Sequence, residues 1–394
     1  MNRISGALRD ALRQTDAVLL SLCTASTLYG MLLIASATYF RNTLKYVAVQ
    51  GLGLLIGLAL YFLLSNIDVC ELAKRWKWIL GFNVGFMLLL LTPFGQARNG
   101  NRAWLGVNDI GRSLGVAFLK NFPVTIQPAE VVKVFFVVLL AYQLALLNEN
   151  QDLRRFENVI RPTAHMLFMV GLIVVISGDA GSALVYIFIF ICMVFSAGMA
   201  ARWLALGLGG GAVAFAAVWK LDLIPGYMKD RFRVVLDHSY DVQDKGFQQT
   251  RSMLALGSGE LTGQGLFNGT QTQSPYTWSL PERQTDFIFS VCGEELGFLG
   301  CALVIVLLLA IIVRCLVVAR DAATPMEGYV CVGMAGMLIF QTVANIGMCL
   351  FLMPVIGLTL PFFSYGGSSV VTLFAAMGIV SGVKKRSRPE WLMN

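Results

Sequence analysis

The chain has 394 residues, of which 57% are hydrophobic and only 13% are charged, and its mean hydropathy is +0.70. Soluble globular domains carry about 25% charged residues. This composition therefore excludes an ordinary water-soluble fold and predicts a single integral membrane domain over residues 1–394. The net charge of +7 suits basic loops that meet lipid headgroups, so we expect the membrane, and no nucleic acid, as a partner.

Long apolar stretches alternate with polar loops, and a stretch of about 20 apolar residues is enough to cross a bilayer. The pattern predicts an all-α polytopic membrane protein with about ten transmembrane helices. The expected spans are residues 17–39, 44–65, 76–93, 127–147, 164–178, 181–200, 203–220, 286–313, 327–353 and 366–383.

Lysine and arginine gather in alternate short loops, which sets the expected orientation by the positive-inside rule. Both termini are then cytoplasmic, and the two long loops, residues 94–126 and 221–285, are extracytoplasmic. The large loop between spans 7 and 8 is rich in glycine in its second half. Because loops held by a rigid scaffold carry function, we expect the functional site on the outer face.

The eight cysteines include no Cys-x-x-Cys pair, and most of them lie within apolar runs. They indicate neither a zinc site nor a disulfide framework. The two histidines, His165 and His238, are far apart in the sequence, so a histidine-based metal site has no support.

A short polar cluster, Leu280-Pro281-Glu282-Arg283-Gln284-Thr285-Asp286, stands where the eighth span begins. We expect Thr285 to cap the helix and Asp286 to lie at its mouth. A desolvated carboxylate there can have a raised pKa and act as a general base. The alternative is a first-turn acid that only favours the helix dipole. Glu294 and Glu295, two to three turns further along the same helix, are expected to make structural pairs.

A second polar group opens the fourth span, where Gln127, Glu130 and Lys133 recur at a spacing that places them along one side of a helix. Two interpretations remain open. Glu130 and Lys133 form a pair that neutralises itself and joins two helices, or Lys133 is an inward-facing cation that meets an anionic group such as a phosphate. Asp179, at a Gly-flanked break, is expected to be a hinge or a helix cap.

The last external turn, residues 353–369, contains two prolines and a Gly-Gly pair. It is either a tight helix connection or a rim that lines a cavity for a lipid headgroup. The spacing of its residues does not decide between the two.

These segments resemble the motifs of the SEDS family (shape, elongation, division and sporulation), which includes RodA and FtsW. The resemblance covers the chain from the first span to Lys385 and rests on several motifs in the right order. They are Asn345-Ile346-Gly347-Met348, Ser364-Tyr365-Gly366-Gly367-Ser368-Ser369, Leu280–Phe289 with Glu294-Glu295-Leu296-Gly297, Ile126–Glu130, Gly178–Leu184 and the segment Gly257–Gln271.

The resemblance implies a ten-span peptidoglycan glycosyltransferase in the bacterial cytoplasmic membrane. Such an enzyme polymerises lipid II, an undecaprenyl-pyrophosphate-linked disaccharide peptide, at the outer face, together with a class B penicillin-binding protein. The family's essential aspartate falls on Asp286, and its polar cavity residues fall on Glu130 and Lys133. The motifs are nearer to RodA than to FtsW, which favours a role in cell elongation and shape; a division or sporulation paralogue remains open.

In this hypothesis Asp286 is the catalytic base. A divalent cation, Mg or Mn, and basic side chains together stabilise the leaving diphosphate, and the ligands of the cation are unknown. The candidate substrate-binding residues are Gln127, Glu130, Lys133, Arg251, Arg283 and Ser364. A flippase for the lipid-linked precursor and a scaffold that only recruits a synthase are the alternatives.

The chain departs from the family pattern at three places. Gln284 stands where the family usually has His, and Phe351 stands where it usually has Gly. The loop between Trp104 and Gln127 is longer than expected, with an extra segment at residues 108–125. We expect this segment to alter partner contact more than chemistry.

Overall fold

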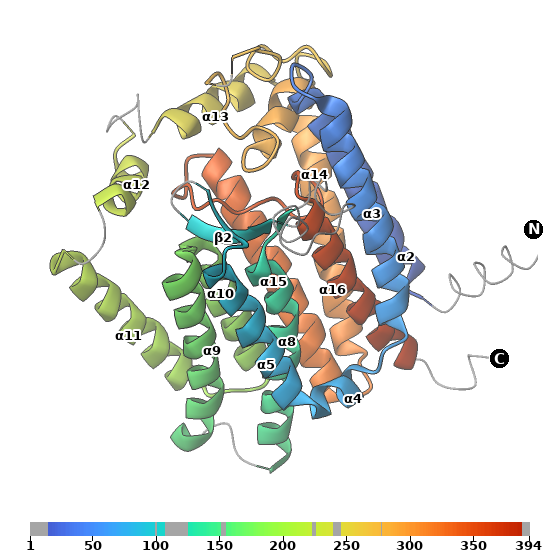
Figure 1. Cartoon of the computed structure of the whole chain (residues 1–394), viewed down its shortest axis with the longest axis vertical. Coiled ribbons are helices and arrows are strands. Elements are labelled where there is room, and N and C mark those ends of the chain that lie inside the picture. Colours follow the sequence, from blue (N-terminus) through green and yellow to red (C-terminus); the bar gives the residue numbers. More distant parts are fainter. Residues whose placement is uncertain are drawn as a thin grey trace, which may run out of the picture.

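The protein is a bundle of long helices with a smaller cap of loops and short helices at one end (Figure 1). The computed structural model of the chain describes residues 15–98, 101–106, 125–150, 155–222, 226–238, 246–276 and 278–387. Its helices are α2 Ala17–Ala37, α3 Thr43–Ser65, α4 Val69–Lys74, α5 Trp76–Leu88 with the 3-10 turn η1 Leu89–Leu91, α8 Pro128–Asn150, α9 Phe156–Ser177, α10 Ala180–Ser196, α11 Ala201–Lys220, α12 Gly226–Leu236, α13 Phe247–Ser258, α14 Ile288–Arg320, α15 Pro325–Cys349 and α16 Gly367–Arg386.

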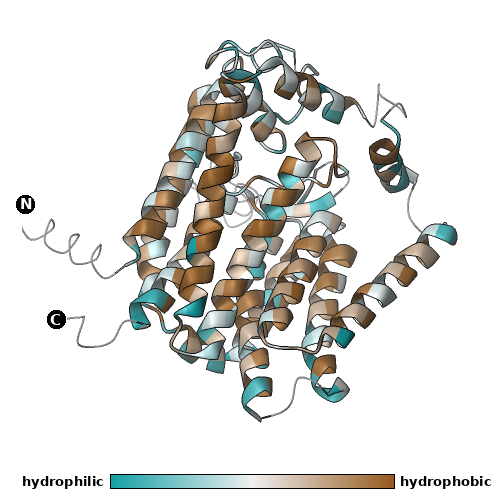
Figure 2. Cartoon of the chain, turned by 180° about the vertical axis from the view of Figure 1, so that it is seen from behind, coloured by the Kyte–Doolittle hydropathy of each residue, from teal (hydrophilic) through white to brown (hydrophobic). Residues whose placement is uncertain are grey.

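Among the described residues, eight helices are long and apolar enough to cross a membrane. Two shorter apolar helices, Trp76–Leu91 and Ala180–Ser196, occupy the third and sixth expected spans. Figure 2 shows hydrophobic residues along most of these helices and hydrophilic residues toward the two ends of the bundle. The predicted helical, multi-pass membrane fold is confirmed, while the count of ten crossings stays a prediction.

The first long loop contains a small antiparallel sheet that the sequence pattern did not predict. Its strands are β1 Gly95–Arg98, β2 Asn101–Gly106 and β3 Thr125–Ile126, in the order β1-β2-β3. Strands of two to six residues are too short to show an alternating pattern. β2 contacts α8 and α9. The expected extra segment at residues 108–125 lies almost wholly outside the described residues.

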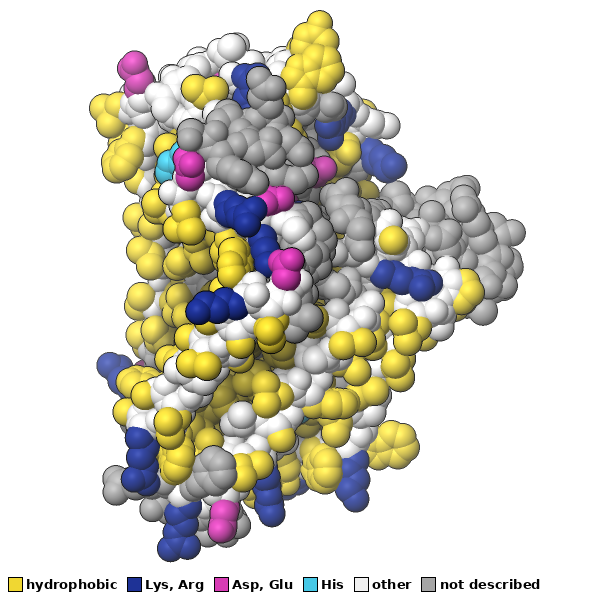
Figure 3. Space-filling model, turned by 90° about the vertical axis from the view of Figure 1, so that its left-hand side faces the viewer, with side chains coloured by type: hydrophobic (Ala, Val, Ile, Leu, Met, Phe, Trp, Pro, Cys, Tyr) yellow, Lys and Arg dark blue, Asp and Glu magenta, His cyan; other side chains and the backbone are white. Residues whose placement is uncertain are grey.

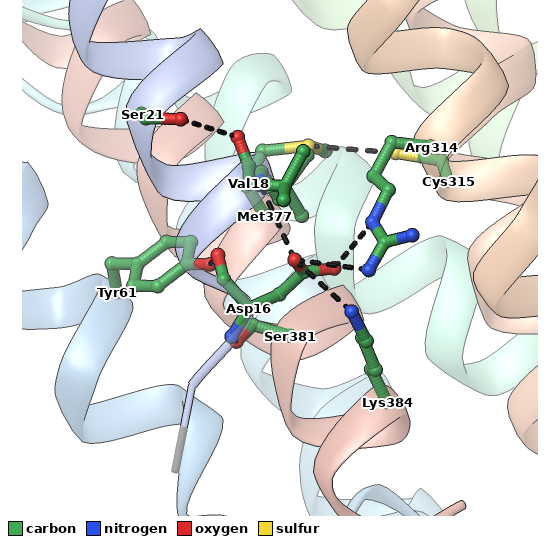
Figure 4. A network of polar contacts seen from close by, with 10 residues as sticks. Asp16, Val18, Ser21, Tyr61, Arg314, Cys315, Met377, Ser381 and Lys384 are labelled. Atoms are coloured by element: carbon green, nitrogen blue, oxygen red, sulfur yellow. Dashed lines mark hydrogen bonds and ion pairs between the residues drawn. The ribbon is translucent and has the colours of Figure 1, made fainter. Parts of the chain in front are cut away.

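The two described ends of the chain meet at a buried carboxylate, that of Asp16 (Figure 4). Arg314 Nε lies 2.8 Å from Asp16 Oδ2, and Lys384 Nζ lies 3.4 Å from Oδ1. The hydroxyl of Tyr61 donates to the Asp16 carbonyl at 2.9 Å, and the Asp16 amide donates to Ser381 Oγ at 2.9 Å. This network joins the start of α2 to α3 and to the final turns of α14 and α16.

Basic side chains surround this end of the bundle, which the positive-inside rule assigns to the cytoplasm. They include Arg314, Arg320, Lys384, Lys385 and Arg386. Figure 3 shows a broad hydrophobic belt on one face of the molecule, with Lys and Arg along its lower edge and mixed charges above it. α14 runs from this basic end to Ile288, so Asp286 lies at the opposite end, which the same rule assigns to the outer face.

The expected span at residues 286–313 corresponds to α14, which is long and apolar enough to cross a membrane. The helix begins at Ile288, extends to Arg320 and is broken at Gly297, whose φ is 66° and ψ is −162°. The glycine-rich part of the large loop packs against this break. The amides of Gln264 and Gly265 donate to the carbonyls of Glu294 and Glu295 at 2.9 and 3.0 Å.

Gly263 shows why this loop needs glycine. Its φ is +82°, and a Cβ added there would lie 2.2 Å from the Glu295 carbonyl oxygen. We predict that Gly263→Ala destabilises the protein by about 2–4 kcal/mol, from backbone strain and overpacking. Gly257→Ala is the matched control, because that position lies within α13 with open space around it. Thermal denaturation in detergent measures both variants, and equal midpoints would contradict this view of the loop.

Candidate active site around Asp286

Asp286 lies in a tight turn just before α14. The carbonyl of Glu282 accepts the amides of Thr285, Asp286 and Phe287 at 3.0, 3.1 and 3.3 Å. The prediction that Thr285 caps the helix is wrong, because the N-cap position is Phe287 and makes no side-chain cap bond. Thr285 Oγ1 instead donates to the Glu282 carboxylate at 3.1 Å. The turn thus places the carboxyl group of Asp286 ahead of the helix rather than within it.

Two other elements hold the backbone of this turn. Asn345 on α15 donates from Nδ2 to the carbonyls of Asp286 and Leu358, at 2.8 and 2.7 Å. Ser364 Oγ donates to the Thr285 carbonyl at 2.6 Å, and the Tyr365 amide donates to the Gln284 carbonyl at 2.9 Å. The two sequence motifs around Asn345 and Ser364 therefore fix the position of Asp286.

The last external turn lies against the Asp286 side chain. A Cβ added at Gly357 would lie 4.0 Å from Asp286 Oδ2. Ser364, a candidate for substrate binding, is buried and uses its hydroxyl for main-chain contacts within this support. The turn connects α15 to α16 and borders the polar site, and its role as a rim of a lipid-headgroup cavity stays a prediction.

Asp286 is a half-buried residue, and its carboxyl group binds a proton more tightly than an ordinary aspartate does. Burial raises its pKa from the ordinary value to about 7, and the negative charges of Glu282 and Asp179 act in the same direction. Arg231 opposes them and lowers the pKa. A carboxylate with a pKa near neutrality is suited to accept a proton during a reaction.

Arg231 is a site residue that the sequence pattern did not single out. It comes from α12 and donates from Nη1 to the Val355 carbonyl at 2.8 Å. α12 rests on α11, where the ring of Phe232 packs against those of Phe215 and Trp219. Nothing in the spacing of the basic residues of α12 distinguishes Arg231 from its neighbours, so only the folded arrangement identifies it.

Asp179 approaches the site from the corner between α9 and α10. Its side chain caps α10 by accepting the Ser182 amide at 3.0 Å, which confirms the expected helix cap. Gln127 Nε2 donates to the second carboxylate oxygen of Asp179 at 2.9 Å. The corner packs on the last external turn, because a Cβ at Gly181 would lie 2.5 Å from the Ile356 carbonyl oxygen. Gln127 thus acts on the site through Asp179.

Glu130 and Lys133 form a buried ion pair on α8, with 2.8 Å between Lys133 Nζ and Glu130 Oε1. Lys133 is only 2% exposed. The Tyr186 hydroxyl donates to the Ala129 carbonyl at 2.8 Å and lies within electrostatic range of both Glu130 and Asp179. The structure therefore shows the self-neutralising pair within one helix, without the expected link between two helices, and an anionic ligand would have to compete with Glu130 for Lys133.

Arg283 supports a loop and is only 2% exposed. Its Nη1 donates to the carbonyls of Gln271, Thr272 and Ser274 at 3.3, 2.5 and 3.1 Å. The same loop is held from the other side by Glu294, which accepts the amides of Gln271 and Thr272 at 2.6 and 2.7 Å. The expected structural role of Glu294 is thus seen, and Arg283 offers no exposed cation.

Arg251 is the remaining candidate cation, and it lies on α13. Its guanidinium carbon lies 5.1 Å from the ring centroid of Phe247, and the side chain is partly exposed. This geometry fits a cation–π contact on the surface of the short helix. Whether Arg251 meets a substrate stays a prediction.

The described part of the chain contains no group of three or more His, Cys, Asp or Glu side chains that could hold a metal ion. Mg²⁺ is often bound by one or two carboxylates together with substrate phosphates. The described residues therefore offer no complete protein cage, and Asp286 with Glu282 would fit Mg or Mn only as such a partial site.

Comparisons with known proteins agree with this arrangement. The family model described as cell cycle protein, of the FtsW, RodA and SpoVE type, matches residues 16–389. A probable peptidoglycan glycosyltransferase FtsW of Geobacter sulfurreducens is 31% identical over 384 residues, covering 94% of this chain and 95% of that protein. Stage V sporulation protein E of Bacillus subtilis is 33% identical over 336 residues, covering 84% and 85%.

Two solved structures have similar folds. A chain from "Structural coordination of polymerization and crosslinking by a peptidoglycan synthase complex" superposes with a TM-score of 0.76 at 29% identity, covering 95% of this chain and 99% of that one. The rod shape determining protein RodA of Thermus thermophilus superposes with a TM-score of 0.67 at 27% identity, covering 95% and 98%.

Proposed function

Because this chain belongs to the FtsW, RodA and SpoVE family, we propose that it is a peptidoglycan glycosyltransferase that polymerises lipid II at the outer face of the bacterial cytoplasmic membrane. The observation that carries the proposal is Asp286, a carboxyl group with a pKa near 7 at the outer end of the bundle. The relative named peptidoglycan glycosyltransferase FtsW supports the reaction class.

In the proposed reaction, Asp286 removes the proton from a sugar hydroxyl of one lipid-linked disaccharide. The hydroxyl oxygen attacks the anomeric carbon of a second, a glycosidic bond forms, and undecaprenyl pyrophosphate leaves with the electrons of the broken bond. General-base assistance of this kind contributes about 100- to 10,000-fold to the rate. The hydrogen bonds of Asn345 and Ser364 to the turn hold the carboxylate in place for that step.

The leaving pyrophosphate is stabilised by positive charge placed where negative charge develops. Arg231 is the basic side chain whose charge acts on Asp286, and Lys133, paired with Glu130 on α8, is a second candidate. A divalent cation bound with the substrate would supply further charge to the pyrophosphate. Arg251 and Arg283 remain weaker candidates, because one lies over an aromatic ring and the other is committed to backbone carbonyls.

We favour a partnership with a class B penicillin-binding protein, supported by the similarity to a chain of a peptidoglycan synthase complex. We propose that the protein acts in cell elongation, because its motifs are nearer to those of RodA than to those of FtsW. A role in division or sporulation is the second candidate, because relatives at 31% and 33% identity carry the names FtsW and stage V sporulation protein E.

The test is reconstitution of the purified chain in liposomes with lipid II, with and without a class B penicillin-binding protein. Products are separated on a gel, and movement of a labelled lipid II across the bilayer is followed in parallel. Growth of glycan chains without lipid movement is the expected result. Lipid movement without growth would favour a flippase. If neither lipid movement nor glycan growth occurred, even with the partner present, the result would favour a scaffold.

The charge on Glu282 gives a prediction about pH. The base is active when deprotonated, so the rate should rise with pH and level off above the pKa of Asp286. Glu282 raises that pKa, so Glu282→Gln should lower the midpoint of the rate profile by roughly half a pH unit. The amide keeps an acceptor for Thr285, so the turn is preserved.

Glu260→Gln serves as the control, because Glu260 is also an exposed glutamate of the outer loop with a positive φ of 49°. Its profile should match that of the unmodified chain. Identical midpoints for Glu282→Gln and the unmodified chain would contradict the electrostatic account of Asp286.

A further inference from the structure

Phe351 has a strained backbone and lies in the turn after α15 that borders the site around Asp286. Its φ is 61°, in the left-handed region that bulky side chains rarely adopt. The ring is only 6% exposed and packs on the imidazole of His238, with 4.3 Å between ring centroids and 35° between ring planes. Backbone strain that a fold retains points to a function for the residue that bears it.

The ring contact fixes the far end of the helix that carries Arg231. His238 lies two residues beyond the end of α12 at Leu236, and Phe351 opens the turn that continues through Val355 to Gly357 beside Asp286. Arg231 donates to Val355 in the same turn. Two side chains, one within α12 and one just after it, therefore attach this helix to the turn that borders the catalytic carboxylate.

On its other side α12 is joined to α11, where Lys229 Nζ donates to the Trp219 carbonyl at 3.1 Å. It packs on α11, and α11 has no buried residue. Figure 1 shows α11 leaning away from the bundle, with α12 standing beside the turn that follows α15. The place of Arg231 thus depends on its contacts with that turn, and one of those contacts is the ring pair.

We propose that His238 and Phe351 form a positioning pair that holds α12 so that the Arg231 guanidinium stays bonded to the turn that borders Asp286 and sets the pH at which the enzyme works. The charged groups that face Asp286 are Glu282 from its own turn, Asp179 from the α9–α10 corner and Arg231 from α12. Of these three groups Arg231 is the positive one, so its displacement leaves the two negative charges unopposed and makes the carboxylate hold its proton more tightly.

Phe351→Gly tests this pair, because glycine removes the ring and also relieves the strained φ. The variant is assayed as folded protein, since the loss of a buried ring costs about 3–5 kcal/mol. The rate of glycan growth is measured against pH in liposomes with lipid II. The midpoint should rise by roughly half a pH unit to one unit, as expected for the loss of a nearby opposite charge. His238→Ala should shift it in the same direction.

Phe267→Gly is the matched control. Phe267 also has a positive φ, of 63°, but its ring contacts Tyr39, away from α12. This variant relieves the same kind of strain and should keep the unmodified midpoint. The double variant Phe351→Gly/Arg231→Gln should show the midpoint of Arg231→Gln alone, because the pair acts through Arg231.

Hydrogen exchange gives a second measurement that needs no activity. Amides of residues 226–238 should exchange faster in Phe351→Gly than in the unmodified chain and in Phe267→Gly. The inference rests on the proposed function, but different results would contradict the function and the positioning pair. A chain that makes no glycan under any condition removes the function, whereas a chain that makes glycan with the same midpoint in Phe351→Gly removes the positioning pair.

Discussion

Asp286→Asn should abolish measurable glycan polymerisation while the protein still folds and inserts. The amide has the shape of the carboxylate but cannot accept the proton of the sugar hydroxyl. Loss of a general base costs about 100- to 10,000-fold in rate. The fold should tolerate the change, since the bonds that hold the turn in place come from its backbone carbonyls to Asn345, Ser364 and Tyr365.

The experiment measures initial rates of chain growth in liposomes that contain equal amounts of folded protein. Asp321→Asn is the control, because Asp321 is an exposed carboxylate at the cytoplasmic end of the same helix. It should retain full activity. A fully active Asp286→Asn would end the proposal that this carboxylate is the base.

The buried pair of Glu130 and Lys133 gives the second large effect. Lys133→Met leaves a buried carboxylate without its cation, which should destabilise the protein by about 3–5 kcal/mol. Glu130→Gln added to Lys133→Met removes both charges and should restore most of the stability. If Lys133 also binds the pyrophosphate, the double variant should still polymerise about 100-fold slower than the unmodified chain.

This design separates the two interpretations that the sequence left open. A stable double variant with normal polymerisation would mean that the pair has only a structural role within α8. The exposed pair Lys74–Glu71 has the same i, i+3 spacing on α4 and supplies the control. Lys74→Met/Glu71→Gln should leave both the denaturation midpoint and the rate unchanged, because exposed ion pairs contribute little.

The apolar pattern located the membrane helices because lipid imposes a length and a composition on each of them. It placed the starts of the helices at Ala17, Thr43 and Trp76 within one residue. It also located α14 but gave no sign of the break at Gly297, because the chain is apolar on both sides of that residue and the loop at residues 259–265 packs against the break. Tertiary contact, not local composition, interrupts that helix.

The site was predictable where a polar residue stands in apolar surroundings. This pattern singled out Asp286, Glu130 and Lys133, because charged residues at membrane depth are rare and usually functional. Asn345 gave the same signal, but only the structure shows that its amide holds the Asp286 carbonyl. Arg231 gave none, because it lies in a polar helix and reaches the site by tertiary packing.

Three charged side chains act on the carboxyl group of Asp286. Glu282 and Asp179 raise the pKa of Asp286, Arg231 lowers it, and burial sets the larger part of the shift. Each charge comes from a different element, so the proton affinity of Asp286 reports on the assembly of the site. Variants that disturb any one of these elements should change the pH dependence before they change the fold.

The most direct test is the rate of glycan growth by the unmodified chain in liposomes, measured from pH 5.5 to pH 8.5 at saturating lipid II. The account predicts a rate that increases about tenfold per pH unit at the acid end and levels off above a midpoint near 7. A rate that is flat across this range, or one that falls as the pH rises, would contradict the assignment of Asp286 as the proton acceptor.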